Sequence, residues 1–441
     1  MSASLALDIL HALRAAGHQA YFAGGSVRDQ LLGRPAADYD VATDALPEHV
    51  QRLFPRHAAV GAQFGVILVH GEAGPEAGHS VEVATFRADL SYADGRRPAA
   101  VRYTGDWRED VRRRDFTVNG LLLDPDTGEV LDAVGGQADL SARVIRAIGD
   151  PRARFREDRL RLLRAPRFAA RLDFTLDAGT AEAIRAEADA LTIVSPERTR
   201  DELLKMLTEG GARRAFELLD DLRLLPVVLP EVAAMKGVAQ PPQFHPEGDV
   251  WTHTLMMLAA LPAGADPVLA LGVLLHDVGK PPTFRRATDR IRFDQHAAVG
   301  AAMAEQIGRR LRLPGEQIEQ LVALVAEHMK FGDVERMRLS TLKRFLRQPG
   351  FARHLELHRL DCLMSHGDLR LYEFARQQLA AAAPEQMRPP RLLTGDDLAA
   401  LGYPPGPAFR EMLAALEDAQ LEGRLVTRAE AVTFLQQRFP R

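Results

Sequence analysis

Two glycines followed by closely spaced carboxylates are the residues of this sequence best suited to chemistry. Gly24 and Gly25 precede Arg28, and Asp38 and Asp40 follow a short distance along the chain. A Gly-Gly pair lets backbone approach a phosphate closely, although alone it usually marks only a turn. Carboxylates two residues apart project from one face of a β-strand, where they can hold a divalent ion such as Mg²⁺. Together these features predict a metal-dependent site for phosphoryl or nucleotidyl transfer.

A third carboxylate and a basic block extend this candidate site. Glu82 lies in the β-rich run 80–86, where it is either a further metal ligand or a solvated strand residue. The run 112–120 joins three arginines to an aspartate, a phenylalanine and an asparagine. Guanidinium groups bind phosphates in a planar fork, so Arg114 and its neighbours suit contacts to a triphosphate and a ribose.

The run 157–167 is a candidate for choosing a base. On one continuous helix, Asp158, Arg161 and Arg164 would step by three and share a side, and a salt-bridged surface helix is the alternative interpretation. Cytosine and adenine both present an amino donor beside a ring-nitrogen acceptor, whereas guanine and uracil present the reverse order. A carboxylate beside a guanidinium matches the first pair and leaves groups unsatisfied with the second. Asp158 with Arg161 therefore predicts selection of C and A.

The same region supplies a local basic patch. Residues 143–171 contain ten arginines and three acids, whereas the whole chain has a formal net charge of −4. Overall charge therefore gives no general attraction to nucleic acid, and this patch is the predicted contact for a phosphate backbone.

Length and composition limit the class of protein. The 441 residues suggest roughly two to four domains, and no apolar stretch approaches the roughly 20 residues of a membrane span. The single cysteine, Cys362, excludes a disulfide framework and fits a reducing cytosol. Asp8 interrupts the apolar run of the N-terminal helix, which is not typical of a signal peptide. We expect a cytoplasmic protein without membrane contact; the sequence predicts no oligomeric state.

Hydrophobic periodicity predicts a small mixed head followed by helices. Strands are expected at 21–23, 38–42, 65–69 and 80–86. Beyond about residue 150 the apolar spacing is helical, at 178–191, 197–209, 212–224, 252–261 and 297–312. Proline-rich stretches near 240 and 385–390 indicate boundaries.

Four blocks, at 24–33, 38–40, 113–119 and 157–167, together resemble the bacterial class II tRNA nucleotidyltransferases. These are the CCA-adding enzymes of the poly(A) polymerase-like family, and the run 195–198 resembles a later structural block of that family. The resemblance covers about residues 20 to 235. It implies a metal-dependent transferase that uses Mg²⁺, ATP, CTP and tRNA. By position it assigns metal binding to Asp38 and Asp40, and nucleotide contacts to Gly25, Arg28, Arg114, Asp158, Arg161, Arg164 and Arg167.

The chain departs from the family pattern within the last block. Arg159 stands where the family has proline, and Pro166 stands where it has a small apolar residue. Proline removes one helix hydrogen bond, so we expect a kink that separates Arg167 from the residues before it.

Members of this family add CCA, CC alone, A alone or poly(A). Enzymes that add only CC have a shortened loop, whereas the segment 88–113, with Tyr92, Asp94, Arg96, Arg97 and Arg102, looks full length. The run 60–65 looks more like the tRNA enzymes than the bacterial poly(A) polymerases. These features leave CCA addition and A addition both open.

A second candidate site lies among the histidines, eight of which fall between residues 245 and 366. In chain order, His253, His276, Asp277, His296, His328 and Asp361 resemble the metal ligands of the HD phosphohydrolase superfamily. Imidazole and carboxylate ligands suit Ni, Mn, Co, Fe or Zn. His245, His354, His358 and His366 are interpreted as structural or surface residues. The resemblance implies phosphatase and 2′,3′-cyclic phosphodiesterase activity, with a silent HD scaffold as the alternative.

The predicted fold class is therefore α+β. A mixed α/β nucleotidyltransferase head (1–140) is followed by an all-α neck and body (141–240), an HD-type domain (241–385) and a helical tail (386–441). The leading functional hypothesis is CCA addition to tRNA. The alternatives are an A-adding or poly(A)-adding relative, and an HD phosphohydrolase with a vestigial head.

Overall fold

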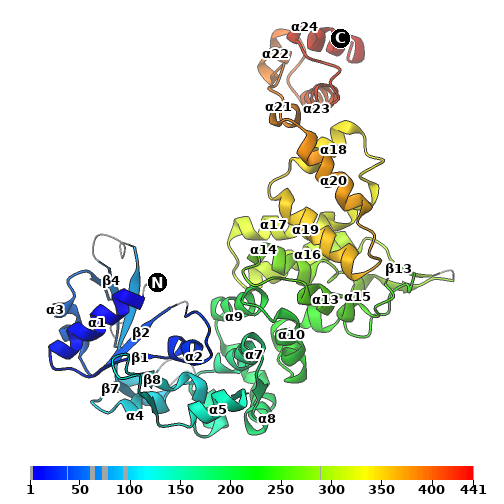
Figure 1. The fold of residues 1–441 in the computed structure, drawn as a ribbon. Coiled ribbons are helices and arrows are strands. Elements are labelled where there is room, and N and C mark those ends of the chain that lie inside the picture. Colours follow the sequence, from blue (N-terminus) through cyan, green and yellow to red (C-terminus); the bar gives the residue numbers. More distant parts are fainter. Residues whose placement is uncertain are drawn as a thin grey trace. The chain divides into compact units, whose positions relative to one another are not determined.

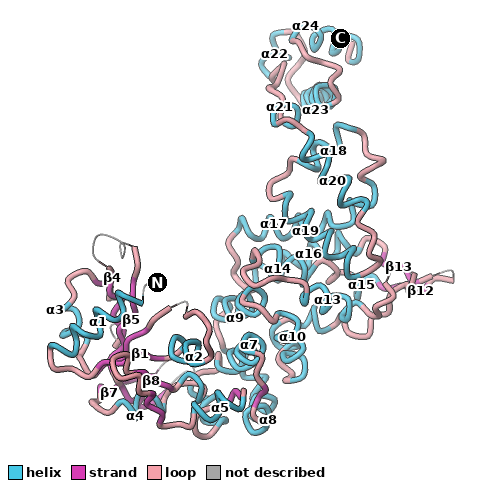
Figure 2. Tube along the Cα trace, in the orientation of Figure 1, coloured by secondary structure: helices cyan, strands magenta, loops and turns pink. Residues whose placement is uncertain are grey.

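The computed structural model describes residues 3–36, 38–59, 65–71, 78–92, 98–243, 245–288 and 290–440. Contacts divide the chain into two compact units, Met1–Ala233 and Ala234–Arg441. Figure 1 labels the elements in chain order, and Figure 2 shows most strands gathered in the first unit.

A mixed sheet forms the centre of the first unit, and seven of its strands lie within the described residues. Their order is β3 (His57–Ala58), β4 (Val66–His70), β5 (Ser80–Thr85), β2 (Asp40–Thr43), β1 (Ala20–Ala23), β8 (Leu121–Leu123) and β9 (Val130–Asp132). β2 and β5 run parallel, and the other neighbouring pairs are antiparallel. The parallel register sets Asp40 opposite Glu82, so two predicted carboxylates lie on adjacent strands.

Helices and a hairpin surround this sheet. They are α1 (Ala3–Ala15), α2 (Gly25–Leu31), α3 (Pro47–Leu53), the hairpin β6 (Arg87–Tyr92) and β7 (Pro98–Tyr103), α4 (Trp107–Arg112), the 3₁₀ turn η2 (Thr117–Asn119) and α5 (Gly136–Ala142). α1 buries Leu5, Ile9 and Leu13 at helical spacing and packs against β1, β2 and β5. α2 packs against β1 and β8, and these contacts fix the turn between β1 and α2.

The rest of the first unit is helical. It comprises α6 (Pro151–Glu157), α7 (Arg161–Leu172), α8 (Ala178–Glu187), η3 (Ala188–Ile193), α9 (Pro196–Thr208), α10 (Ala212–Asp221), α11 (Leu225–Val228) and α12 (Pro230–Ala233). Two short strands, β10 (Val144–Ile145) and β11 (Thr175–Leu176), pair in parallel. α7 packs against both α9 and α10, and nearly all of its side chains are buried.

The second unit is built around α14 (Pro267–Leu275), which is apolar on all sides and almost wholly buried. It packs against α13 (Val250–Ala259), α17 (Gly315–Glu327) and α19 (Phe351–Met364). The remaining elements before the tail are α15 (Lys280–Thr283), the hairpin β12 (Phe284–Arg286) and β13 (Ile291–Phe293), α16 (His296–Arg310), η4 (His328–Asp333), α18 (Leu339–Leu346), α20 (Arg370–Ala381) and α21 (Pro384–Met387).

Three helices at the C-terminal end have a core of their own. α22 (Gly395–Ala400), α23 (Ala408–Leu421) and α24 (Arg428–Arg438) bury Leu398, Leu416 and Leu435 together. Capping boxes at Thr394 and Thr427 fix the starts of α22 and α24. α23 is joined to α18 by ion pairs from Arg344.

The predicted fold class is confirmed, with small differences in detail. The regions predicted to be helical contain the two short strand pairs β10–β11 and β12–β13 in addition. The predicted loop residues Asp94, Arg96 and Arg97 and the run 60–64 lie outside the described residues. Among the residues that are described, no helix has both the length and the apolar character needed to cross a membrane.

The first turn of α16 depends on a close backbone approach. A Cβ at Gly279 would lie 2.1 Å from the carbonyl oxygen of His296 and 2.5 Å from the nitrogen of Gly300. Because both atoms belong to backbone, no side-chain rotation can make room. The absence of a Cβ at Gly279 therefore lets His296 lie beside the loop that carries Asp277.

We expect Gly279→Ala to push α16 away and to lower the free energy of unfolding by about 1–3 kcal/mol, as overpacking of a core does. Urea denaturation measures this loss. Gly315→Ala is the matched control, since a Cβ there meets nothing within 4 Å. Equal denaturation midpoints for Gly279→Ala and the wild type would contradict the close packing.

Candidate active sites

The first candidate site is a cavity of about 600 Å³ within the first unit. Its walls include every metal-binding and nucleotide-contacting residue predicted for that unit except Glu82. These are Gly25, Arg28, Asp38, Asp40, Arg114, Asp158, Arg161, Arg164 and Arg167. Among the described residues, nine cationic and five acidic side chains line the cavity, so its charge suits a polyanion such as a triphosphate.

Asp40 lies at the start of β2, and its surroundings disfavour a lone negative charge. Burial and then the carboxylate of Glu82 raise the pKa of Asp40 to about 6, with Arg114 acting in the opposite direction and Asp38 adding to the rise. A divalent cation would relieve this repulsion among the three carboxylates. Their chemistry therefore fits Mg²⁺, which prefers hard oxygen ligands.

Asp38 does not lie on the strand, contrary to the prediction. β2 begins at Asp40, which pairs with Ala23, the last residue of β1. Gly24 then turns the chain with φ of 69°, a left-handed conformation that favours glycine, so no strand continues beside Asp38. A Cβ at Gly24 would lie 3.6 Å from Asp40 Oδ2 and 3.4 Å from Arg114 Nη1. The turn thus brings bare backbone up to both the carboxylate and the guanidinium.

Arg114 is held in place by Asp110, a residue that the sequence analysis did not select. Asp110 lies on α4 and is 1% exposed. Its Oδ1 accepts hydrogen bonds from Arg113, and its Oδ2 accepts one from Arg114 Nη2 at 3.2 Å. Burial alone would raise the pKa of Asp110, but these two arginines lower it, so the residue remains an anion. The i, i+3 and i+4 spacing of the three residues was the available signal.

Asp115 joins the arginine block to α7. Its Oδ2 accepts a 2.8 Å hydrogen bond from Arg164 Nε, and its Oδ1 accepts from the backbone of Phe116 and the side chain of Asn119. Burial would raise the pKa of Asp115, but Arg164 and these hydrogen bonds hold it well below its usual range. The ion pair fixes Arg164 at the wall of the cavity.

Arg28 is buried and takes part in the same network. Its guanidinium donates to Asp29 Oδ1 and to Asn119 Oδ1, each at 2.7 Å, and only 2% of the residue is exposed. Burial lowers the pKa of Arg28, and Asp29 opposes this effect. The contacts with Asp29 and Asn119 show that Arg28 braces α2 against η2, and its predicted contact with a nucleotide stays a prediction.

Asp158 and Arg161 line one cavity but do not lie on one helix, so that part of the prediction is wrong. α6 ends at Glu157 and α7 begins at Arg161, and Asp158 between them has an extended backbone. Its carboxylate accepts from the backbone of Leu160, an arrangement by which aspartate commonly interrupts a helix. Arg198 of α9 binds both Asp158 oxygens, at 3.1 and 2.8 Å.

Arg161 and Arg167 are each fixed by carboxylates. Arg161 donates to Glu157 at 2.7 Å and to the carbonyl of Arg113 at 2.8 Å. α7 extends on both sides of Pro166, and beyond it Arg167 donates to Glu202 at 2.6 Å with 4% of the residue exposed. Arg167 thus anchors α7 to α9, and its predicted contact with a nucleotide stays a prediction.

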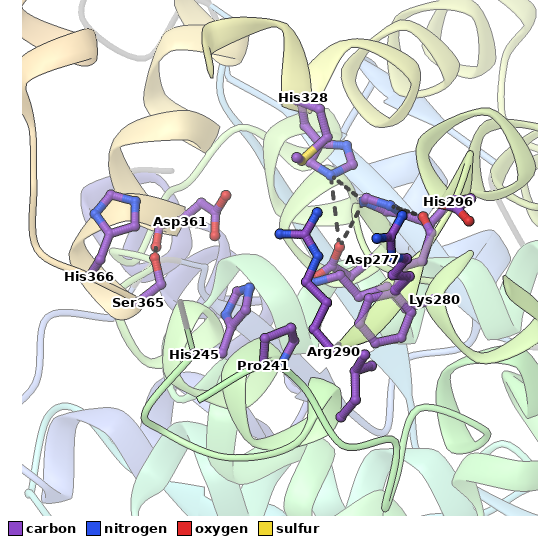
Figure 3. Close-up of a pocket in the computed structure, with 15 residues that line it drawn as sticks. Pro241, His245, Asp277, Lys280, Arg290, His296, His328, Asp361, Ser365 and His366 are labelled. Carbon is purple, nitrogen blue, oxygen red and sulfur yellow. Dashed lines mark hydrogen bonds and ion pairs between the residues drawn. The ribbon is translucent and has the colours of Figure 1, made fainter. Parts of the chain in front are cut away.

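The second candidate site is a cavity of about 390 Å³ in the second unit (Figure 3). Asp277 lies at its centre. Asp277 Oδ2 is 3.2 Å from His276 Nε2 and 2.6 Å from Lys280 Nζ. Asp277 Oδ1 is 3.6 Å from His296 Nε2 and 3.8 Å from His328 Nε2. Burial would raise the pKa of Asp277, but His276 and Lys280 outweigh it and keep this carboxylate charged.

Three of the predicted histidine ligands have their Nδ1 atoms fixed by backbone. His276, His296 and His328 place Nδ1 at 3.0, 2.9 and 2.7 Å from the carbonyls of Val273, Phe293 and Val325. Because a carbonyl only accepts, Nδ1 carries the hydrogen and Nε2 keeps a lone pair. Each ring therefore presents a metal-ligating nitrogen toward Asp277, and His296 and His328 line the cavity.

His253 and Asp361 complete this group, with His253 Nε2 3.1 Å from Asp361 Oδ1. The Nε2 atoms of His253 and His276 are buried and have no well-aligned hydrogen bond. The Nε2 atoms of His296 and His328 lie 3.2 Å apart. Orphaned imidazole nitrogens facing a carboxylate fit a transition-metal site.

The structure also adds residues that the sequence analysis had set aside. His245, interpreted as structural or surface, lines the second cavity. Glu247, which was not singled out, contacts His245 and His253. Their short sequence separation, with His245 and Glu247 just before α13, was the available signal.

We expect Asp115→Asn to lower the free energy of unfolding by about 2–3 kcal/mol at pH 7, because removing a buried charge partner leaves Arg164 uncompensated. This expected loss is small for a buried ion pair, because the Arg164 side chain is 32% exposed and water screens its charge. The depressed pKa makes this stabilisation fully present above the unfolded value of about 3.9, and it is lost as the pH falls through the folded value.

Urea denaturation of the wild type and Asp115→Asn at a series of pH values tests this expectation. The difference between the two proteins should shrink below about pH 4. Asp126→Asn, which removes an exposed partner of Arg14, is the control with an expected effect within about 0.5 kcal/mol. A difference independent of pH would contradict the assigned charge.

Comparison with known proteins places three family segments on the chain. Residues 20–146 match the poly A polymerase head domain, and residues 173–236 match the probable RNA and SrmB-binding site of polymerase A. Residues 250–363 match the HD domain.

The CCA-adding enzyme of Bacillus subtilis (strain 168) is 45% identical over 219 residues, which are 50% of this chain and 54% of that protein. The chain thus spans about half the length of the curated relatives it matches. The crystal structure of the Bacillus stearothermophilus CCA-adding enzyme in complex with CTP is similar over 99% of both chains, with a TM-score of 0.75 and 27% identity. The Thermotoga maritima CCA-adding enzyme complexed with tRNA has the same fold over 99% of this chain and 95% of that chain, with a TM-score of 0.59 and 19% identity. The chain therefore carries segments that match the poly A polymerase head domain and the HD domain, and it is similar to CCA-adding enzymes in sequence and in fold.

Proposed function

We propose that this protein adds C, C and A to tRNA 3′ ends, using CTP and ATP and releasing pyrophosphate. One observation carries the proposal: a single cavity joins the carboxylates Asp38 and Asp40 to the Gly24 turn and to a wall of arginines. Similarity to a CCA-adding enzyme structure with bound CTP supports the choice of nucleotide.

The residues of the cavity are assigned different roles in nucleotidyl transfer. Asp38 and Asp40 would hold Mg²⁺, which supplies Lewis-acid stabilisation at the α-phosphate when bound. Arg114, anchored by Asp110, lies close to Asp40 at the Gly24 turn. Its guanidinium is placed to hold the triphosphate while the tRNA 3′-hydroxyl displaces pyrophosphate.

Base choice is assigned to protein side chains, without a nucleic-acid template. Asp158 would accept from the amino group of cytosine or adenine, and Arg161 would donate to the neighbouring ring nitrogen. Arg198 holds the Asp158 carboxylate from α9. Oδ1 accepts from both Arg198 and Leu160, whereas Oδ2 accepts only from Arg198 and keeps a lone pair for a further donor. Arg161 is oriented by Glu157 and by the carbonyl of Arg113.

Two alternative functions remain distinct from this proposal. An A-adding or poly(A)-adding enzyme would use the same cavity and differ only in the nucleotides incorporated. A hydrolase with a vestigial head would not need Asp38, Asp40 and Arg114 gathered in one charged cavity, so the first site favours a transferase.

A second activity is proposed for the HD cavity, namely phosphatase and 2′,3′-cyclic phosphodiesterase chemistry. Its imidazole and carboxylate groups suit Ni, Mn, Co, Fe or Zn. Lys280 supplies a cation beside Asp277, which suits a phosphate ester. A catalytically silent HD scaffold is the competing interpretation.

The predicted division into head, neck and body, HD-type domain and tail belongs to the same proposal. The matched family segments and the two compact units support it. A cytoplasmic location is likewise proposed, supported by the single buried cysteine, Cys362.

Single-turnover extension of three purified tRNAs, ending before CCA, after C and after CC, tests the transferase. Each tRNA receives Mg²⁺ with CTP, ATP or both. We expect full CCA on the first tRNA with both nucleotides, and arrest at CC with CTP alone. Extension of only the CC-ended tRNA by ATP would identify an A-adding enzyme, and no extension would shift the activity to the HD site.

Paired substitutions separate the two sites. Asp40→Asn should lower transfer by more than about a hundredfold and leave Ni²⁺- or Mn²⁺-dependent phosphodiester hydrolysis unchanged. Asp277→Asn should do the reverse. Loss of both activities from either substitution would contradict two independent sites.

Arg198→Ala should lower kcat/KM for CTP and ATP by about tenfold or more, because Asp158 loses the group that orients it. Discrimination against UTP and GTP should fall as well. Arg200→Ala on the same helix is the control, since that side chain pairs with Asp201 and does not line the cavity. Unchanged efficiency and discrimination in Arg198→Ala would exclude the Asp158–Arg198 pair from base selection.

A further inference from the structure

A buried carboxylate beside the HD cavity belongs to neither group of predicted ligands. Only 5% of the Glu247 side chain is exposed. Its Oε1 lies 2.7 Å from Nδ1 of His253 and 2.9 Å from Nδ1 of His245. One carboxylate oxygen therefore contacts two imidazoles, whose ring centroids are 5.0 Å apart.

The contact with Glu247 replaces the backbone contact of the other histidine ligands. His276, His296 and His328 each place Nδ1 against a carbonyl of their own chain segment. His253 instead places Nδ1 against Glu247, which precedes α13 in an irregular segment. An ionised carboxylate accepts but does not donate, so Nδ1 of His253 carries the hydrogen. Its metal-ligating atom is then Nε2, which faces Asp361.

The same reasoning applies to His245. Its Nδ1 donates to the same Glu247 oxygen, which leaves Nε2 with a lone pair. Figure 3 shows His245 among the side chains of the cavity, between Asp361 and Arg290. Ligand atoms of His245, Glu247 and His253 all lie within 4.8 Å of one another.

A buried oxygen of Glu247 makes a purely structural role a poor explanation. Within the described part of the chain, Glu247 Oε2 has no hydrogen-bond partner although it is buried. An unsatisfied buried acceptor typically costs about 1–3 kcal/mol. A residue kept only for packing would be better replaced by an apolar one of similar size.

We propose that Glu247 is a positioning residue of the HD metal site, which fixes the Nδ1–H tautomers of His253 and His245 together and adds His245 to the metal-binding group. The inference rests on the proposed metal site and deepens it. A carboxylate–histidine–metal arrangement of this kind raises the basicity of the ligand and fixes the ring orientation. It would join the irregular segment before α13 to the metal centre.

Isothermal titration of the full chain with Ni²⁺ tests the proposal. Glu247→Ala should weaken Ni²⁺ binding by about 10–100-fold, and His245→Ala should weaken it less. Glu247→Gln keeps one acceptor oxygen, so this variant should bind Ni²⁺ more tightly than Glu247→Ala does. Glu356→Ala is the control, because Glu356 pairs with Arg359 and does not line the cavity.

The outcomes separate the inference from the metal site itself. The metal site itself is identified as Ni²⁺ binding that the wild type shows and Asp277→Ala lacks. If the wild type shows no such binding, both the metal site and the role of Glu247 are overturned. Wild-type binding with equal affinity in Glu247→Ala would overturn the role of Glu247 alone. If Glu247→Ala does not fold, ¹⁵N shifts of His253 and His245 in the Zn²⁺-loaded wild type decide the question. Nδ1–H signals are expected, and Nε2–H tautomers would overturn the proposal.

Discussion

The ion pair between Asp115 and Arg164 is the interaction on which the first site depends. Asp115 follows the arginine block of the head, and Arg164 lies on α7, so the pair links the sheet to the helices. The same carboxylate also holds Asn119, whose side chain accepts from the buried Arg28. Without this network, the position of α7 relative to the Gly24 turn would not be fixed by these side chains. The spacing between Asp40 and the pair Asp158 and Arg161 within the cavity would then not be fixed.

Charge explains why the cavity needs so many supporting acids. Its lining is rich in arginine, and unpaired guanidinium groups at such close range would repel one another. Asp110, Glu157 and Glu202 are not among the residues that line the cavity. They accept hydrogen bonds from Arg113, Arg161 and Arg167, respectively, and so fix the positions of these guanidinium groups. The arginines keep an excess of positive charge for a polyanion. The carboxylates Asp40 and Glu82, in contrast, repel each other, and Arg114 offsets only part of this repulsion.

The sequence predicted the fold class and the main groups of residues because their signals are local. Strand alternation, helical spacing and the glycine turn depend on neighbours within a few residues. It did not predict that Asp158 leaves the helix by accepting from the backbone of Leu160, nor that Arg198, 40 residues further along the chain, binds its carboxylate. Nor did it predict the start of β2 at Asp40, which follows from the end of β1. His245 was set aside for a different reason, because a histidine two residues before a glutamate is common on protein surfaces and its place in the cavity appears only in the fold.

The two sites solve one problem by the same physical means. A charged or metal-ligating side chain can bind a ligand well only if its orientation is fixed. In both sites, a neighbouring group forms the hydrogen bond that fixes this orientation. Arg198 does this for Asp158, and backbone carbonyls do it for three histidines. The Nε2 atoms of His253 and His276 have no well-aligned hydrogen bond and lie against the carboxylates of Asp361 and Asp277. Imidazole nitrogens that face carboxylates in a buried cluster have the chemistry that a transition-metal ion prefers.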